Sequence, residues 1–223
     1  MATTTRRRIY YPESDGRPMG ETEVHVFELI RILTTLHAWF RRAADIYVGG
    51  SMMFYYEEGN PKASLSPDVF AVFGVPTAPP RRTYKLWEEG VPPAAVFEIT
   101  SRKTRREDLG KTHALYERIG VREYILYDPL DEYLHPPLQG FRLLDGAYAP
   151  IAPEPDGALH SEALGLMLRL VDGRLRLFDR TSDAELLSPE ERADAETTRA
   201  DIAEARVAEL EARLRGANGR QDR

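Results

Sequence analysis

The chain has 223 residues, 42% of them hydrophobic and 30% charged, a balance that suits a globular protein with a sizeable core. No apolar run reaches the roughly 20 residues that a membrane-spanning helix needs, and the N-terminus, MATTTRRRIY, lacks the apolar stretch of a secretory signal. The net charge of −6 argues against a wholly basic protein that coats nucleic acid, and the absence of cysteine excludes disulfides, thiolate catalysis and cysteine-bound zinc. We therefore expect a cytoplasmic protein without a membrane partner.

The first predicted element is an amphipathic helix over residues 23–42. Its apolar residues recur at steps of three and four, which is the spacing of one helix face. We expect this face to pack on the core, and it consists of Val24, Phe27, Ile30, Leu33, Leu36 and Phe40. The polar residues His25 and Glu28 also share a face of this helix, and we favour a packing or surface role for both over contact with a metal.

Residues 46–75 are predicted to form a β-hairpin. The stretch DIYVGGSMMFYY is rich in β-branched and aromatic residues and ends at the turn sequence EEGN, and SLSPDVFAVFGV supplies the second strand. A proline-rich, basic loop follows at 76–93. Residues 94–100 are the next predicted strand, and they contain Glu98 within an otherwise small and apolar run.

A well-marked helix follows this strand. Thr104 and Glu107 have the spacing of a capping box, and Gly120 stands where the residue after a helix belongs. The inner face of this helix is expected to consist of Leu109, Thr112, Tyr116 and Ile119.

The remaining elements complete an α/β fold. Residues 121–129 read as a strand that Asp-Pro ends, and the region 132–180 holds short apolar runs broken by the hairpin signals Asp145-Gly146 and Asp172-Gly173. We interpret this region as antiparallel additions to the sheet. The predicted architecture is a mixed central β-sheet flanked by helices, with an antiparallel β extension and a long C-terminal helix.

The sequence divides into three parts. Residues 1–19 are expected to be a flexible segment, 20–187 the folded domain, and 188–223 a long helix with a frayed end. In this helix a three-four spacing resembles a weak coiled-coil seam, formed by Ala193, Glu196, Ala200, Ala203, Val207, Leu210 and Leu214. The pattern leaves two interpretations open, a self-associating helix and a solvated one.

Two acidic residues stand where strands should be apolar. Asp68 begins the strand SPDVFAVFGV, and alternation places it on one face with Phe70 and Val72, while Glu98 shares a face with Val96. Neighbouring strands lie about 4.8 Å apart, so two inward carboxylates can approach closely. Without a cation they repel each other. A divalent metal such as Mg²⁺ or Mn²⁺ removes the conflict, because it accepts two carboxylates and retains water.

Basic residues surround this predicted site. Lys111 lies in the first turns of the following helix, where it could orient a water molecule or neutralise charge on phosphorus. Arg102, Lys103, Arg105 and Arg106, with Arg81, Arg82 and Lys85 of the long loop, could hold a phosphodiester backbone. These residues predict metal-assisted phosphodiester hydrolysis, with DNA as the partner.

Simpler interpretations stand beside this one. Asp68 could cap backbone amides at a strand entry, Glu98 could pair with a buried cation, and Lys111 could be a solvated helix lysine. A P-loop, a dinucleotide-binding glycine motif, a zinc-protease helix motif and a serine-nucleophile elbow are all absent from the sequence. The alternatives to an enzyme are a non-catalytic nucleic-acid-binding or regulatory protein and an interaction module that acts through the C-terminal helix.

The stretches SPDVFAVFGV and PAAVFEITSRKTRREDLGKTHALYERIGVREYILYDP resemble the Uma-type family of putative restriction endonucleases, within the PD-(D/E)XK nuclease superfamily. The resemblance extends from about residue 20 to residue 187 and is most specific at 66–129. It implies a restriction-endonuclease-like core and a magnesium- or manganese-dependent DNA endonuclease. A homodimer is expected, because two sites related by a two-fold axis can cut both strands.

The resemblance also assigns residues to the family motifs. Pro67 and Asp68 match the PD pair, and Glu98 matches the acidic residue of the second motif. The superfamily has a lysine two positions later, where this chain has Thr100. The resemblance implies that Lys111 on the helix takes that role. Tyr116, five residues further on, is similar to a tyrosine of related nucleases and, with Glu28, is a supporting residue.

Overall fold

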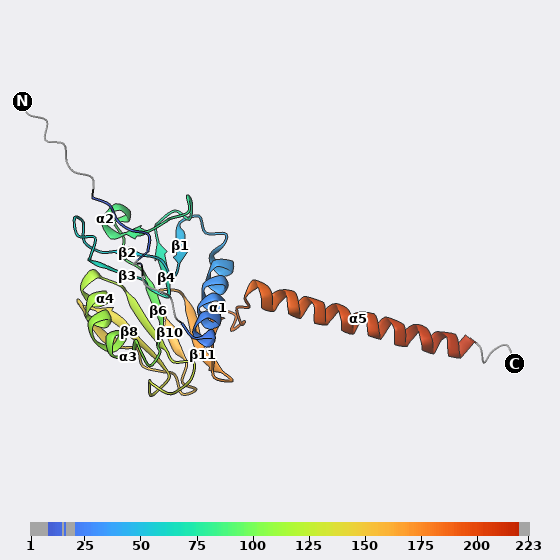
Figure 1. Cartoon of the computed structure of the whole chain (residues 1–223). Helices are drawn as coiled ribbons and strands as arrows, with labels where there is room; N and C mark the ends of the chain where they lie inside the picture. Colours follow the sequence, from blue (N-terminus) through green and yellow to red (C-terminus); the bar gives the residue numbers. More distant parts are fainter. Residues whose placement is uncertain (1–8, 15, 17–20, 219–223) are drawn as a thin grey trace, which may run out of the picture. The chain divides into compact units, whose positions relative to one another are not determined.

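The structure is a computed structural model that describes residues 9–14, 16 and 21–218 (Figure 1). The predicted flexible segment 1–19 and the last residues of the predicted frayed end therefore lie largely outside the described residues. The chain forms two compact units, Met1–Leu186 and Leu187–Arg223, each of which is described by itself. None of the helices in the described part of the chain combines the length and apolarity that crossing a bilayer requires.

A six-stranded mixed sheet forms the centre of the first unit. Its order is β1-β4-β6-β7-β8-β9, and only β6 and β7 run parallel. The predicted antiparallel pairing within 46–75 is confirmed, since Ile46 lies opposite Phe73. The strands are β1 (Ile46–Gly49), β4 (Val69–Phe73), β6 (Ala95–Ile99), β7 (Glu123–Tyr127), β8 (Leu138–Leu144) and β9 (Ala147–Pro150).

Two small sheets accompany the central one. The segment between β1 and β4, which was expected to be part of a simple hairpin, forms two short strands that pair in a separate sheet with β5. The second small sheet is an antiparallel set of three strands. The predicted turns at Asp145-Gly146 and Asp172-Gly173 are confirmed, and all four residues have positive φ. The small sheets contain β2 (Phe54–Tyr55), β3 (Ser64–Leu65) and β5 (Tyr84–Lys85), and β10 (Leu159–Ser161), β11 (Leu166–Val171) and β12 (Arg174–Asp179).

One part of the prediction for region 132–180 is wrong. Only β8 and β9 extend the central sheet, whereas β10–β12 form a separate sheet. The leucines of β10, β11 and β12 pack in the same buried cluster as Ala95, Phe97 and Ile99 of β6. The three strands thus cover a face of the central sheet, where their leucines are removed from water.

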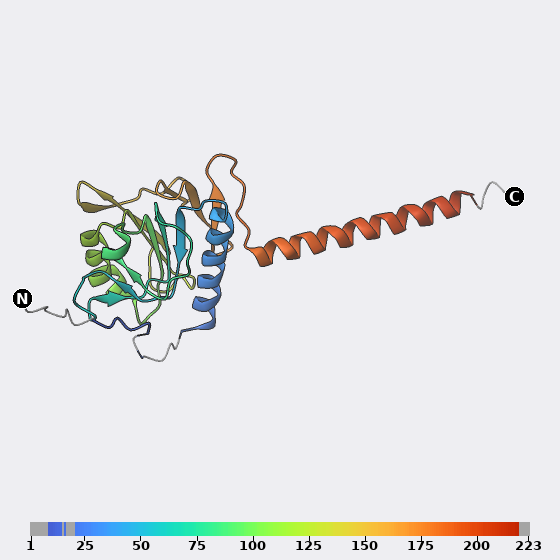
Figure 2. The ribbon, with the colours of Figure 1, turned by 90° about the horizontal axis from the view of Figure 1, so that it is seen from above.

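Helices lie on both faces of the central sheet (Figures 1 and 2). Helix α1 (Glu23–Phe40) packs with β10–β12 on one face through Ile32 and Leu36. The other face carries Phe70, Val96 and Tyr116, which belong to a second buried cluster. The elements after β6 are α3 (Arg105–Glu107), the π-helix Asp108–Thr112 and α4 (His113–Ile119), and the loop before β6 holds α2 (Leu86–Glu89).

The predicted inner face of α1 is correct for Leu33, Leu36 and Phe40, which pack on the core, and wrong for the first half of the helix. Phe27 is 60% exposed and Ile30 is 47% exposed, whereas His25 and Glu28 are buried together with Ile32 and Leu36. The helix is turned about its axis so that two polar residues face inward, because each has a polar partner there. His25 meets Asp68, and Glu28 pairs with Arg31.

The helix after β6 also differs from its prediction. Thr104 makes no side-chain cap, and its hydroxyl instead accepts a hydrogen bond from the amide of Ser101 at 3.1 Å. A π-helical turn at Asp108–Thr112 shifts the phase, so that Asp108 is buried and Leu109 is 41% exposed. The end of the helix is as predicted, with Gly120 at φ 85°.

The second unit is one helix, α5 (Pro189–Asn218), of 30 residues. It begins with a capping box, in which the amide of Glu191 donates to the Ser188 hydroxyl and the Glu191 carboxylate accepts from the amide of Ser188. Its apolar residues Ile202, Val207 and Leu210 are 65%, 55% and 43% exposed. The side chain of Leu214 lies outside those that the structure describes.

Candidate active site

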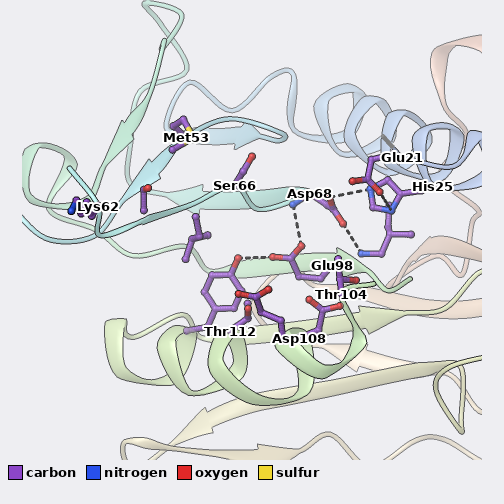
Figure 3. A pocket seen from close by; sticks show the side chains of 15 residues that line it. Glu21, His25, Met53, Lys62, Ser66, Asp68, Glu98, Thr104, Asp108 and Thr112 are labelled. Carbon is purple, nitrogen blue, oxygen red and sulfur yellow. Dashed lines mark hydrogen bonds and ion pairs between the residues drawn. The ribbon is translucent and has the colours of Figure 1, made fainter. Parts of the chain in front are cut away.

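Asp68 and Glu98 meet at one wall of a cavity of about 530 Å³ (Figure 3). Asp68 directly precedes β4, and Glu98 lies on the neighbouring strand β6, where Val69 pairs with Phe97. The amide of Ile99 donates to Asp68 Oδ2 at 2.7 Å, and the amide of Asp68 donates to Glu98 Oε2 at 3.3 Å. Two adjacent strands therefore hold both carboxylates through backbone hydrogen bonds.

A glycine lets the chain pass close to Asp68. A Cβ atom on Gly50 would lie 2.4 Å from the carbonyl oxygen of Asp68, which is too close for any side chain. The next amide, that of Ser51, donates to the carbonyls of Pro67 and Asp68 at 2.8 and 3.2 Å. Sequence reasoning did not single out Gly50, because close contact between distant backbone segments leaves no local pattern.

His25 of α1 holds the other oxygen of Asp68. Its Nε2 lies 3.2 Å from Asp68 Oδ1, and its Nδ1 lies 3.9 Å from the carboxylate of Glu21 without a hydrogen bond. Burial alone would lower the pKa of His25, but the hydrogen bond and charge of Asp68 leave it raised. His25 thus belongs to the site, although its sequence context favoured a packing role.

Tyr116 of α4 supports Glu98. The Tyr116 hydroxyl donates to Glu98 Oε1 at 2.6 Å, and the tyrosine side chain is fully buried. Burial, and then the charge of Glu98, raises the pKa of Tyr116 well above its ordinary value. The hydroxyl therefore stays protonated and acts as a fixed donor. Glu28 does not line this cavity, and its carboxylate binds Arg31 at 2.5 Å.

The cavity is strongly acidic. Burial, and then the charge of Asp68, raises the pKa of Glu98, and burial also raises the pKa of Asp108. Among the described residues that line the cavity, only Lys62 and His25 can carry positive charge, against the five acids Glu21, Asp68, Glu98, Glu107 and Asp108. Such an excess of carboxylates favours the entry of a cation.

The donor set fits a hard divalent ion that retains water. The described residues contain no group of three or more acids or histidines arranged around one metal position. Asp68 and Glu98 are two oxygen donors on one wall, which is the number of carboxylates that Mg²⁺ commonly takes from a protein. The residues present therefore fit Mg²⁺ or Mn²⁺ better than a metal that needs a complete protein cage.

Lys111 is exposed and does not line this cavity. The positions that do line it on this helix are spaced by four and include Asp108, Thr112 and Tyr116. Lys62, in the turn between β2 and β3, is the lysine of the lining, at the end of the cavity away from His25 (Figure 3). Sequence reasoning missed Lys62, because a single lysine in a turn carries no periodic signal.

Thr100 occupies the position where the superfamily pattern has lysine. Its side chain is buried, and its hydroxyl donates to Asp108 Oδ2 at 3.3 Å. Position 100 therefore supplies no positive charge, and its hydroxyl instead orients the carboxylate of Asp108.

The predicted basic residues fall into two groups. Arg81, Arg82 and Lys85 are each paired with an acid, Glu89, Glu13 and Glu88, at 2.6, 2.7 and 3.0 Å. The residues that follow Glu98 form no ion pair with any residue that the structure describes, and all are exposed: Arg102, Lys103, Arg105 and Arg106. Only the second group presents unneutralised positive charge next to the cavity.

One comparison with known proteins identifies a family. A family model described as "Uma2: Putative restriction endonuclease" matches residues 5–172. Among solved structures, the chain is similar to one titled as a putative nuclease belonging to DUF820 from Anabaena variabilis, at 14% identity and a TM-score of 0.47, over 68% of this chain and 81% of that one. No curated protein matches the chain significantly.

Proposed function

The chain belongs to the Uma2 family of putative restriction endonucleases, and on that premise we propose that it is a metal-dependent endonuclease that hydrolyses phosphodiester bonds in DNA. The observation that carries the proposal is the convergence of Asp68 and Glu98 on one cavity wall, linked by a hydrogen bond from the amide of Asp68 to Glu98. A phosphate cannot approach so acidic a wall without a counter-ion. Mg²⁺ or Mn²⁺ is the proposed cofactor.

Asp68 and Glu98 would hold the metal, helped by a backbone carbonyl of Ile99 or Thr100. When bound, a divalent ion activates water and offsets charge on the phosphate oxygens. The chain supplies the orientation: His25 fixes one oxygen of Asp68, and Tyr116 fixes one oxygen of Glu98. Because both contacts restrain the carboxylates beforehand, little reorganisation is needed on binding.

Cations position the substrate. Arg102, Lys103, Arg105 and Arg106 bind the phosphate backbone beside the cavity. Lys62, at the end of the cavity away from His25, binds a phosphate next to the one that is cut. Lys111 keeps the proposed role of the catalytic cation, which requires its exposed side chain to turn toward the cavity.

Two copies act together in this proposal. Cutting both strands of a duplex calls for two sites, and a symmetric homodimer provides them. Helix α5 is the proposed contact between the copies, because its apolar residues Val207 and Leu210 are exposed at the spacing of a coiled-coil seam.

Nicking of supercoiled plasmid in Mg²⁺ or Mn²⁺ tests the proposal. The wild-type chain is expected to nick the plasmid, and Asp68→Ala or Glu98→Ala to lower the rate by about 100-fold or more. Glu88→Ala is the matched control, because Glu88 is an exposed acid on α2, outside the cavity lining, and is paired with Lys85. Activity that survives both cavity substitutions would place the chemistry elsewhere.

A non-catalytic nucleic-acid-binding protein is the second candidate, and two observations favour it. Thr100 stands where the superfamily has lysine, and Lys111 lies outside the cavity lining. This candidate predicts that the wild-type chain retards DNA in a gel and nicks no plasmid in any divalent metal. The same plasmid assay therefore separates the two functions.

A further inference from the structure

A second cavity, of about 170 Å³, adjoins the first. The two cavities share Glu21, His25 and Ile99 as a common wall. On the far side of this wall the lining changes in character, because Pro129, Leu130 and Tyr133 line the second cavity where the first cavity has carboxylates. The second cavity therefore suits a different chemical group.

The sheet explains why this cavity exists. Because β6 and β7 run parallel, with Ile99 opposite Tyr127, the loops that follow them leave the same edge. The crevice beyond the carboxyl ends of parallel strands is a common place for ligands in α/β folds. The loop after β6 supplies Arg102 and Lys103 to the lining, and the loop after β7 supplies Leu130 and Tyr133.

A buried acid fixes the conformation of the loop after β7. The buried carboxylate of Asp128 accepts hydrogen bonds from the amides of Leu130, Tyr133 and Leu134, at 3.1, 2.5 and 2.9 Å. Leu130 is nevertheless 48% exposed. The backbone thus presents an apolar side chain to solvent at the mouth of a preformed cavity, and a preformed site loses little entropy when it binds.

The positive charges at the mouth of the second cavity indicate which kind of ligand it suits. Arg102 and Lys103 are exposed, and within the described part of the chain neither forms an ion pair. A free anion would gain nothing from Leu130 and the Tyr133 ring, and an apolar side chain would gain nothing from the two cations. A nucleotide uses both, because its base is a flat π-surface and its phosphate is anionic.

We propose that the second cavity is a subsite for the nucleobase next to the phosphate that a divalent ion would bind beside Asp68 and Glu98. The proposal rests on the proposed function, because the shared wall links this base to the cut phosphate. The base lies against Leu130 and stacks on Tyr133, while Arg102 and Lys103 bind the phosphate on its far side. The cavity selects for an unpaired or unstacked base and contributes binding rather than chemistry.

The test measures binding of a short single-stranded oligothymidylate to the full chain by fluorescence anisotropy in Ca²⁺, a divalent ion that takes oxygen ligands. Leu130→Ala and Tyr133→Ala are each expected to weaken binding by about 5- to 150-fold, the range for loss of one stacked base. Leu144→Ala is the matched control, because Leu144 is 54% exposed at the tip of the β8–β9 hairpin. It is expected to bind as the wild type does.

A series of oligonucleotides, each with one abasic residue, makes the test specific. At one position the abasic residue weakens binding of the wild-type chain, and there Leu130→Ala and Tyr133→Ala cause no further loss. The subsite is overturned if both variants match Leu144→Ala on every oligonucleotide while plasmid nicking persists, which leaves the proposed function intact. A wild-type chain that neither binds nor cuts nucleic acid would overturn both proposals.

Discussion

The backbone amide of Asp68 donates a hydrogen bond to the carboxylate of Glu98, at 3.3 Å. The amide after Glu98, that of Ile99, donates in return to the carboxylate of Asp68 at 2.7 Å. Each acid is therefore held by the strand that carries the other. The fold therefore holds the two carboxylates close together before any ligand binds, although two negative charges repel each other.

Divalent metal is expected to stabilise the wild-type chain against heat. An ion that binds only the folded state adds about 2.7 kcal/mol at a concentration one hundred times its dissociation constant. Asp68→Asn and Glu98→Gln each remove one charged ligand and should abolish most of the shift in melting temperature that Mg²⁺ or Mn²⁺ causes. Scanning fluorimetry with and without metal measures it. A shift of equal size in the wild type, both variants and Glu88→Gln would contradict the site.

The contribution of Glu98 to stability without metal is expected to fall as pH rises above about 4.5, the ordinary pKa of a glutamate. Burial, and then Asp68, raises the pKa of Glu98 in the folded chain, so the unfolded chain loses this proton first. In the window between the two pKa values the folded state binds more protons, and the free energy of unfolding decreases with pH.

Glu98→Gln removes this titration and keeps an oxygen acceptor for Tyr116. We expect the variant to gain melting temperature relative to the wild type as pH rises from 4.5 toward neutrality. Thermal melts in EDTA across this range measure the difference. Glu88→Gln should run parallel to the wild type. A constant offset between Glu98→Gln and the wild type at all pH values would show that Glu98 titrates normally.

Lys62→Ala is expected to weaken DNA binding through one lost phosphate contact. The slope of log K against log salt should become shallower by about 0.9 for duplex DNA. Lys111→Ala should change that slope less than Lys62→Ala and mainly lower the cleavage rate, because Lys111 lies outside the cavity lining and its proposed role is in catalysis. Binding titrations at several salt concentrations measure both slopes. A cleavage rate of Lys111→Ala equal to that of the wild type would remove Lys111 from the catalytic set.

The acid pair was predictable because strand geometry is simple. Alternate residues share a face, so the strand around Phe70 and the strand around Val96 could each be assigned a buried side, and the acids at Asp68 and Glu98 stood out against it. The family motif gave the same pair independently. Tyr116 followed from the family resemblance, and the structure places its hydroxyl 2.6 Å from Glu98.

The residues on helices were harder to place. A helix face depends on how the helix is turned against the sheet, and in α1 the polar contacts of His25 and Glu28 outweigh the apolar spacing that includes Phe27. After β6, a π-helical turn that no sequence pattern marks moves Asp108 inward and leaves Lys111 outside the cavity. At this cavity, tertiary contacts therefore override the local sequence patterns from which helix faces are predicted.

Helix α5 is expected to join two copies of the chain as a parallel coiled coil. The seam consists of two positions of the heptad, one with Ala193, Ala200 and Val207 and the other with Ala203 and Leu210. Arginines flank the seam on one side, at Arg199 and Arg206. Glutamates flank it on the other, at Glu204 and Glu211. In a parallel pair each arginine faces a glutamate of the other copy, whereas an antiparallel pair sets like charges together.

Charge reversal tests the association. Arg199→Glu with Arg206→Glu places four acids along each interface edge and should convert the full chain from dimer to monomer in sedimentation or light scattering. Glu204→Arg with Glu211→Arg should do the same. Mixing the two double variants restores opposite charges and should yield a heterodimer.

The outward-facing Asp201 provides the control, since Asp201→Arg reverses one charge of α5 without touching the seam. This variant should remain a dimer. If the wild type is a monomer, α5 is a solvated helix and cutting of two strands must proceed one site at a time. If both double variants stay dimeric, the two copies associate through a surface other than this seam. Double variants that stay monomeric when mixed would show that charge pairs along the seam do not hold the two copies together.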